Sequence, residues 1–396
     1  MLRVIELAGG LASQFATMTL AELGADIVKV ELPGGDAARS RRQAAPGDFS
    51  FEYLNRRKRS VCIDRSTKQG RKLLLDLVSG ADAVVEDLDA AIVRRQRLSY
   101  RSLRAANANI VVASISPFGR SGPRAEWVAN DFIVQAMGGI VHGTGWDDGP
   151  PQKLPGELAG FLAGLQAAAM TVGAVFGVRR DEPGGERGDH HGGAGGVHFD
   201  ISMQEAVSTH WTREIERWVY HGLGGSRGNR DMGLQGFPHT VMARDGWVFV
   251  LALMAEWEPL AHFLGLDDFV THEWSDPQTR YERWAEIEPQ FTASIASRGK
   301  YQWLTDSAEA GYTFAPIDDV LEMQHSPQLA ARDFFGSTEV DGEALKHPRL
   351  PFNWAAAPAG ENRAPTLGEH TDEVLDHLLG IAGDERAKLR AAGVTG

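Results

Sequence analysis

The chain has 396 residues, of which 43% are hydrophobic and 23% are charged, a composition typical of a globular protein. Its length exceeds what one hydrophobic core usually supports, so two lobes are expected. A net charge of −13 argues against nucleic acid as a partner, because a phosphate backbone attracts positive charge. The single cysteine, Cys62, excludes an intrachain disulfide framework and is expected to be a buried, inert thiol in a reducing compartment.

The N-terminus shows no secretory signal and enters an apolar, strand-like run at residues 2–7. Residues 158–178 form 21 positions without a charge, which is long enough to span a bilayer. They contain four glycines, however, and the chain on both sides is typical of a cytosolic α/β protein. We therefore expect a buried helix there, no membrane partner and a cytoplasmic location.

The first half of the chain alternates short apolar runs with helical patterns, which is typical of βαβ units around a parallel sheet. The expected strands are 3–7, 25–31, 60–63, 83–86, 110–115 and 197–201, and the expected helices are 15–23, 68–79 and 203–220. The predicted fold class is therefore α/β, with a Rossmann-like large domain containing a parallel sheet. The turn after the first strand lacks the glycine spacing of a dinucleotide site, so NAD binding is not expected.

A low-complexity stretch at residues 181–196 contains seven glycines and predicts a flexible loop. Its adjacent His190 and His191 have no thiol nearby and only carboxylates of the same loop, so no metal site is expected. Beyond residue 221, turns and aromatic residues dominate, and Asp245-Gly246 between apolar runs predicts a hairpin.

The C-terminal part of the chain, residues 301–379, has helical periodicity with a Pro-rich connection at 348–365. The predicted domains are a large Rossmann-like domain at 1–220, a smaller α+β domain at 221–300, and a segment at 301–396 that returns to the large domain.

Several motifs are distributed along the whole chain. They include Leu-Ala-Glu-Leu-Gly-Ala-Asp within 15–31, Asn-Arg-Arg-Lys-Arg-Ser at 55–60, Gln-Ala-Met-Gly-Gly at 135–139 and Leu-Gly-Glu-His-Thr-Asp at 367–372. Together these motifs resemble the class III CoA-transferase family, which includes formyl-CoA transferase, α-methylacyl-CoA racemase and carnitine CoA-transferase. Because that family builds interlocked dimers, the resemblance implies the same assembly here.

The resemblance also implies nucleophilic catalysis by a carboxylate. In the family, an aspartate four residues before a helix glycine attacks the acyl-CoA thioester and forms a mixed anhydride. That glycine matches Gly164, and the nucleophile position is Gly160. Since glycine has no side chain, the chain is expected to have no catalytic residue. Glu157 is a weak alternative, because a helix would displace it by about 4–5 Å along the axis from position 160. Asp131 is a further carboxylate to consider.

CoA carries several phosphate groups, which need cations and oriented N–H groups. The basic clusters at 56–59 and 94–97 are candidates, and the resemblance assigns a CoA contact to Arg95. The predicted CoA-binding residues are Arg95, Arg94, Arg57, Lys58 and Arg65. Asp87 stands where the family has an asparagine and is expected to repel phosphate. CoA and acyl-CoA are expected as substrates, with no covalently bound cofactor.

The leading hypothesis is a non-catalytic subunit of a heteromeric class III CoA-transferase, paired with a homologous catalytic subunit and using a donor such as succinyl-CoA. Succinyl-CoA:benzylsuccinate CoA-transferase resembles this arrangement, because one of its two related subunits lacks the aspartate. Two alternatives stay open: an active homodimeric transferase or racemase using Glu157 or Asp131, and a CoA-binding pseudoenzyme. Glycines 156, 160 and 164 are expected on one helix face that packs within the chain.

Overall fold

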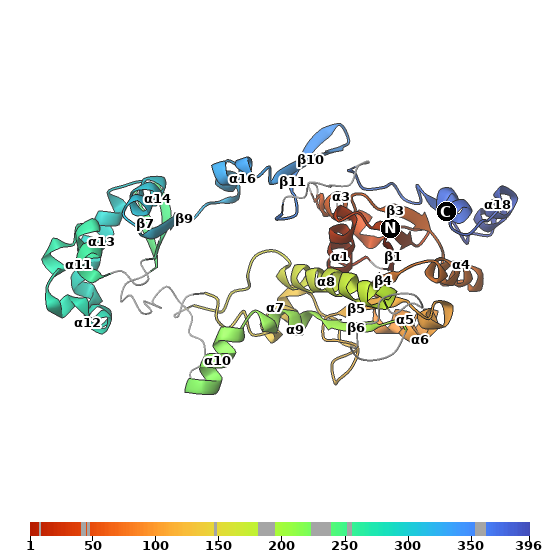
Figure 1. The fold of residues 1–396 in the computed structure, drawn as a ribbon, viewed down its shortest axis with the longest axis horizontal. Helices are drawn as coiled ribbons and strands as arrows, with labels where there is room; N and C mark the ends of the chain where they lie inside the picture. The colour runs from red at the N-terminus through yellow and green to blue at the C-terminus, as the bar shows by residue number, and fades with distance from the viewer. Residues whose placement is uncertain are drawn as a thin grey trace. The chain divides into compact units, whose positions relative to one another are not determined.

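The computed structural model describes residues 1–7, 9–40, 45, 48–145, 149–180, 195–222, 239–251, 256–352 and 362–396. These residues form two compact units (Figure 1). The first comprises Met1–Ile140, Lys153–Thr212 and Phe334–Gly396, and the second comprises Val141–Gln152 and Arg213–Asp333. The division into two units does not test the domain bounds expected from the sequence, which stay a prediction. Most of the glycine-rich loop, with His190 and His191, lies outside the described residues.

The first unit contains a six-stranded parallel sheet with the order β3-β2-β1-β4-β5-β6, which confirms the predicted Rossmann-like α/β fold. Its strands are β1 (Arg3–Leu7), β2 (Asp26–Glu31), β3 (Arg59–Cys62), β4 (Ala83–Glu86), β5 (Val111–Ser116) and β6 (His198–Ser202). Its helices are α1 (Leu11–Glu22), η1 (Ala37–Ser40), α3 (Ser50–Leu54), α4 (Lys68–Ser79), α5 (Ala90–Gln96), α6 (Tyr100–Ala106), α7 (Asp131–Met137), α8 (Leu158–Arg180), α9 (Met203–Thr209), α17 (Thr371–His377) and α18 (Gly383–Ala391). A separate hairpin joins β10 (Phe335–Val340) and β11 (Glu343–Pro348).

Two hydrophobic cores cover the two faces of this sheet. One holds apolar residues of α4, α6, α17 and α18, and the other holds residues of α1, α8 and α9. Alternation along the strands divides the side chains between the cores: Val4 faces the α1 and α8 side, whereas Ile5 and Leu7 face the other. Cys62 is buried, as expected.

The second unit combines a three-stranded sheet with several helices. The strands, in the order β7-β8-β9, are β7 (Thr240–Ala243), β8 (Gly246–Leu251) and β9 (Thr313–Pro316). The helices are α11 (Trp257–Phe263), η3 (Asp267–Phe269), η4 (His272–Ser275), α12 (Pro277–Glu282), α13 (Trp284–Ala296), α14 (Lys300–Glu309), α15 (Val320–Met323) and α16 (Pro327–Ala331). The antiparallel pairing of β7 with β8 confirms the hairpin predicted at Asp245-Gly246. α10 (Thr212–His221) crosses the boundary between the units.

The helix α8 packs against both the sheet and α1. The segment Leu158–Val178 is long and apolar enough to cross a membrane by length and composition. Its inner face, which includes Ala163, Ala167 and Val175, belongs to the core shared with α1 and β5. Leaving this core would expose the apolar surface of several elements at once, so α8 is a core helix of the first unit.

Candidate functional site

The order of the strands reverses between β1 and β4 in the middle of the large sheet. In open α/β sheets, this reversal leaves a crevice beyond the carboxyl ends of the strands, and ligands bind there. Gly9 and Gly10 follow β1 at this point, and Asp87 follows β4. The candidate site is built outward from these three residues.

The Asp87 carboxylate lies at the N-terminus of α1. It accepts hydrogen bonds from the Gly10 N–H (3.2 Å), the Ser13 N–H (3.3 Å) and the Ser13 hydroxyl (2.8 Å). The helix has no side-chain cap of its own, so Asp87 satisfies N–H groups that would otherwise lack partners. Burial raises the pKa of Asp87, even though these hydrogen bonds oppose the shift. The carboxylate therefore binds donors that a phosphate would otherwise need.

The two glycines after β1 make room for two carboxylates. A Cβ on Gly10 would lie 2.1 Å from Asp87 Oδ2, and a Cβ on Gly9 would lie 2.3 Å from Asp36 Oδ1. The sequence predicts only a tight turn at this pair. The structure shows that glycine is needed because side chains approach the backbone from neighbouring loops.

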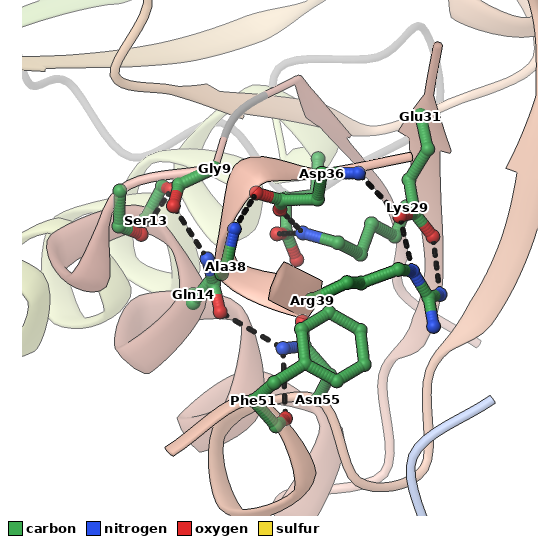
Figure 2. Close-up of polar contacts among 12 residues, drawn as sticks. Gly9, Ser13, Gln14, Lys29, Glu31, Asp36, Ala38, Arg39, Phe51 and Asn55 are labelled. Atoms are coloured by element: carbon green, nitrogen blue, oxygen red, sulfur yellow. Dashed lines mark hydrogen bonds and ion pairs between the residues drawn. The ribbon is translucent and has the colours of Figure 1, made fainter. Parts of the chain in front are cut away.

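A buried network of charges lies behind this turn (Figure 2). Lys29 Nζ lies 2.7 Å from Glu6 Oε1 and 2.6 Å from Asp36 Oδ2, and all three side chains are almost fully buried. Glu6 also accepts a 2.6 Å hydrogen bond from the Thr17 hydroxyl. Burial would raise the pKa of Glu6, but Lys29 and Lys58 override it and hold the pKa at about 2.

Lys58, one of the predicted CoA contacts, belongs to this network. Its Nζ donates to Glu6 Oε2 at 2.8 Å, to the Gln14 carbonyl at 3.0 Å and to Asn55 Oδ1 at 3.1 Å. Burial lowers the pKa of Lys58 to about 8, although Glu6 opposes the shift. The same Asn55 donates to the Gln14 side chain, which in turn donates to the Gly9 carbonyl (Figure 2). This network fixes the turn after β1 onto the start of α1.

Gly160 lies in the first turn of α8, where it is buried against α1. A Cβ at this position would meet Leu11 Cδ2 at 2.7 Å. One turn later, a Cβ on Gly164 would lie 2.5 Å from the Ala12 carbonyl oxygen and 3.2 Å from Phe15. The two glycines thus allow a close contact between α8 and α1 inside the same unit.

The expectation that Gly156 shares this face was wrong. α8 begins at Leu158, and Gly156 precedes it in the left-handed conformation, with φ of 73°. A Cβ on Gly156 would meet no atom within 4 Å. Helical spacing does not apply to Gly156, because the helix starts two residues later.

Asp131 caps the N-terminus of α8. Its Oδ1 accepts a 2.8 Å hydrogen bond from the Ala159 N–H, and its Oδ2 accepts a 2.5 Å bond from the Gln135 amide. Lys153 Nζ lies 3.6 Å from the same carboxylate. Asp131 is therefore held beside position 160 by bonds to its neighbours, an arrangement that suits a cap.

Glu157 has a different environment. It is exposed immediately before α8, and its carbonyl accepts a bond from the Phe161 N–H. Among the described residues, its carboxylate has no hydrogen-bond or ion-pair partner. Glu157 is thus the free carboxylate near the start of α8.

The first basic cluster is engaged in intrachain contacts. Arg56 donates to Glu22 Oε1 at 3.1 Å and to the Tyr53 carbonyl, and its side chain is 1% exposed. Arg57 Nε lies 3.6 Å from Glu22 Oε2. Arg65, predicted as a further CoA contact, is buried and donates to Gln96 Oε1 at 3.0 Å. A run of basic residues usually lies on the solvent-exposed surface, but the side chains of Arg56 and Arg65 are buried.

The second basic cluster lies at the end of α5 and divides into a paired and an unpaired arginine. Both terminal nitrogens of Arg94 bind the Glu126 carboxylate, one at 2.7 Å. The neighbouring Arg95 is exposed, and it has no ion pair or hydrogen bond within the described part of the chain. Of these two predicted contacts, Arg95 is the one with a free charge.

No metal centre accompanies these groups in the described residues, because no cluster of three or more His, Cys, Asp or Glu side chains could hold an ion there.

Comparison with known proteins gives the family. The profile of CoA-transferase family III matches residues 2–371. The chain belongs to the class III CoA-transferase family. Members of this family use CoA thioesters as substrates.

Relatives with assigned activities align along almost the whole chain. A succinyl-CoA:mesaconate CoA-transferase of Haloarcula hispanica is 32% identical and covers 98% of both chains. Subunit BbsE of the succinyl-CoA:(R)-benzylsuccinate CoA-transferase of Thauera aromatica is 27% identical over 94% of this chain and 92% of its own. A CAIB/BAIF family protein from Brucella suis has a similar structure, with a TM-score of 0.80, 27% identity and coverage of 95% and 98%.

Sequence reasoning did not identify Leu11 or the capping role of Asp87. Leu11 fills the space beside Gly160, but only the packing of α8 on α1 brings these residues together. Asp87 is adjacent to the end of β4, and a polar residue there, opposite a Gly-Gly turn, could have suggested a contact across the switch point.

Proposed function

We propose that this chain is the non-catalytic subunit of a heteromeric class III CoA-transferase. The observation that carries the proposal is Gly160 at the nucleophile position of the family. A carboxylate is needed there to form the acyl anhydride, and the space beside Gly160 is filled by Leu11. Asp131 does not supply the missing group, because its carboxylate is bound to Ala159 and Gln135.

The proposed partner is a homologous chain that carries the aspartate. The name of BbsE supports this assignment, since that relative is one subunit of its enzyme. The donor we propose is succinyl-CoA, which the names of the Haloarcula hispanica and Thauera aromatica relatives contain. The acceptor we propose is an aryl-substituted dicarboxylic acid of the benzylsuccinate type, and the assembly is expected in the cytoplasm.

Hydroxylamine trapping tests this assignment, because hydroxylamine intercepts an acyl anhydride as a hydroxamate. The isolated chain, incubated with succinyl-CoA, should give no hydroxamate. Co-expressed with a class III homologue from the same genome that carries the aspartate, it should form a stable complex that gives hydroxamate. Replacing that aspartate by asparagine should abolish the signal, while the complex stays intact. Hydroxamate from the isolated chain would contradict the proposal.

A second candidate function is an active homodimer that uses Glu157. The observation that favours it is the exposed, unpartnered carboxylate at the start of α8. The N-terminus of a long helix would also stabilise a developing oxyanion nearby. Glu157→Gln separates the two functions: loss of turnover by the isolated chain would support the homodimer, and unchanged behaviour of the complex would support the subunit.

A further inference from the structure

The first turn of α1 is the place at the crevice where an anionic group would bind. α1 begins at Leu11, directly after the turn that follows β1 at the switch point. A helix N-terminus in this position offers free N–H groups and a partial positive charge, and phosphate groups of ligands bind there in other α/β proteins. In this chain Asp87 takes these donors, through bonds from the Gly10 N–H (3.2 Å), the Ser13 N–H (3.3 Å) and the Ser13 hydroxyl (2.8 Å). An incoming phosphate would have to displace the carboxylate.

The Asp87 carboxylate is held in this position by the sheet. Asp87 directly follows Glu86, which pairs with Leu7 of β1. The Leu88 N–H donates to the Glu86 carboxylate at 2.8 Å, so the backbone is fixed on both sides of Asp87. A Cβ on Gly10 would lie 2.1 Å from Asp87 Oδ2, which shows how closely the carboxylate packs against the turn. The donors of α1 are therefore bound by a group that cannot diffuse away.

The cations around this turn are also paired within the chain. They bind carboxylates at or beside the carboxyl ends of β1, β2 and β4, at distances of 2.6–2.8 Å, and the pairs are Lys29 with Glu6 and Asp36, Lys58 with Glu6, Arg39 with Glu31, and Arg120 with Glu86. These four cations are balanced by four carboxylates, and Asp87 adds a fifth. CoA carries a diphosphate and a 3′-phosphate, so its phosphates would meet an excess of negative charge, which is costly where water is excluded.

The space beside position 160 is closed as well. A Cβ on Gly160 would lie 2.7 Å from Leu11 Cδ2, so the first turn of α1 covers the start of α8. Leu11 and Ser13 belong to the same turn, and Ser13 holds Asp87 from there. Side chains of this chain thus occupy both the donors of α1 and the space at position 160, where the proposed function places the missing nucleophile.

We propose that Asp87 is an internal anion that closes this crevice to phosphate, and that the heteromeric pair therefore binds one acyl-CoA, on the catalytic subunit. The inference rests on the proposed function, to which it adds the number and the place of the substrate sites. A carboxylate that is part of the chain forms its hydrogen bonds without losing translational freedom, whereas a dissolved phosphate loses this freedom on binding. Asp87 therefore has the advantage over a phosphate at the same donors.

Isothermal titration with inorganic pyrophosphate tests the role of Asp87 in the isolated chain. The wild type should show no saturable binding. Asp87→Asn should bind pyrophosphate at least about tenfold more tightly than the wild type, because an amide oxygen holds the α1 donors about half as strongly as a carboxylate does and the excess negative charge is removed. The matched control is Asp82→Asn, because Asp82 accepts the Arg3 N–H at 2.8 Å at the amino end of β4. This control should bind no pyrophosphate.

Titration of the complex with CoA tests the number of sites. One CoA per pair, with none on the isolated chain, is expected. Two CoA molecules per pair, or saturable CoA binding by the isolated wild-type chain, would overturn the inference, and the proposed function would stand if the pair still transfers CoA.

The variants keep the role of Asp87 testable by itself. An Asp87→Asn chain that keeps the wild-type melting temperature but binds no pyrophosphate would overturn this role. If Asp87→Asn lowers the melting temperature, Asp87→Ser, which retains a hydrogen-bonding oxygen without the charge, gives the same readout. Failure of the pair to transfer CoA would refute the proposed function, while the pyrophosphate titration would still decide whether Asp87 closes the crevice.

Discussion

Gly160 is the residue on which the proposed loss of the nucleophile depends. The motif spacing assigns the nucleophile position to Gly160 by a local count along one helix, and this assignment stays a prediction. The sequence did not reveal that Leu11 fills the adjacent space, because that contact joins two helices about 150 residues apart. Such contacts depend on tertiary packing, and a local pattern contains no trace of them.

Gly160→Asp tests whether the nucleophile is the only missing part. The Asp side chain would meet Leu11 Cδ2, the end of a flexible side chain, so we expect the variant to fold. We expect no CoA transfer by the isolated variant, because a reactive group needs its supporting residues as well. Steady-state transfer from succinyl-CoA and hydroxylamine trapping measure the result. The double variant Gly160→Asp, Leu11→Ala is the control that removes the steric obstacle, and turnover by either would show an intact site.

Loss of the buried Glu6 carboxylate should cost substantial stability. Glu6→Gln leaves Lys29 and Lys58 buried with one fewer negative charge, and breaking a buried ion pair typically costs about 3–5 kcal/mol. Asp76→Asn, at an exposed carboxylate paired with Lys72, should cost about 1 kcal/mol or less. Urea unfolding of the two variants measures the difference, and equal losses would contradict the importance of the buried network.

The same residue predicts a dependence on pH. The pKa of Glu6 in the folded chain is about 2, below its ordinary value of 4.5, so the folded state favours the ionised form. Its contribution to stability is therefore complete above pH 4.5 and is lost as the pH falls toward 2. Wild-type stability should decline faster than that of Glu6→Gln over this interval.

At the scale of elements, local signals predicted the first half of the chain well. The bounds of α4 and β4 match the expected 68–79 and 83–86, and Thr67 caps α4 through its hydroxyl. The predicted helix at 203–220 is instead α9 and α10, which are separated at residues 210–211. The helical interpretation of 301–379 missed β9, β10 and β11. Short strands such as β9 carry too few residues for periodicity to distinguish them from helix ends.

Three glycines of α8 give a matched test of its packing. Gly164→Ala places a Cβ 2.5 Å from a backbone oxygen that cannot move aside, so a loss of about 1–3 kcal/mol is expected. Gly160→Ala faces only the end of Leu11 and should cost less. Gly173→Ala meets nothing within 4 Å and should gain up to about 1 kcal/mol from higher helix propensity. Thermal unfolding measures the order, and destabilisation by all three alike would contradict it.

At the scale of the whole molecule, α8 has two apolar faces and only one is covered within its unit. Its outer face exposes Leu165, Val172 and Phe176, which lie on one side of the helix, whereas Ala163 and Ala167 lie in the core. Contiguous exposed apolar surface of this kind marks a site of protein–protein contact. The proposed heteromer provides an occupant for this face, namely the homologous catalytic subunit.

Val172→Glu tests this use of the outer face. The side chain is exposed, so the isolated variant should keep the melting temperature of the wild type. In the complex, the added carboxylate would be buried without a partner, which opposes pairing. We expect co-purification with the catalytic subunit to fail, with loss of the transfer activity that depends on the pair. Gln69→Glu places the same charge on the exposed surface of α4 and should pair normally. Normal pairing of Val172→Glu would show that the partner contacts another surface, and a lowered melting temperature would show that Val172 supports the fold of its own chain.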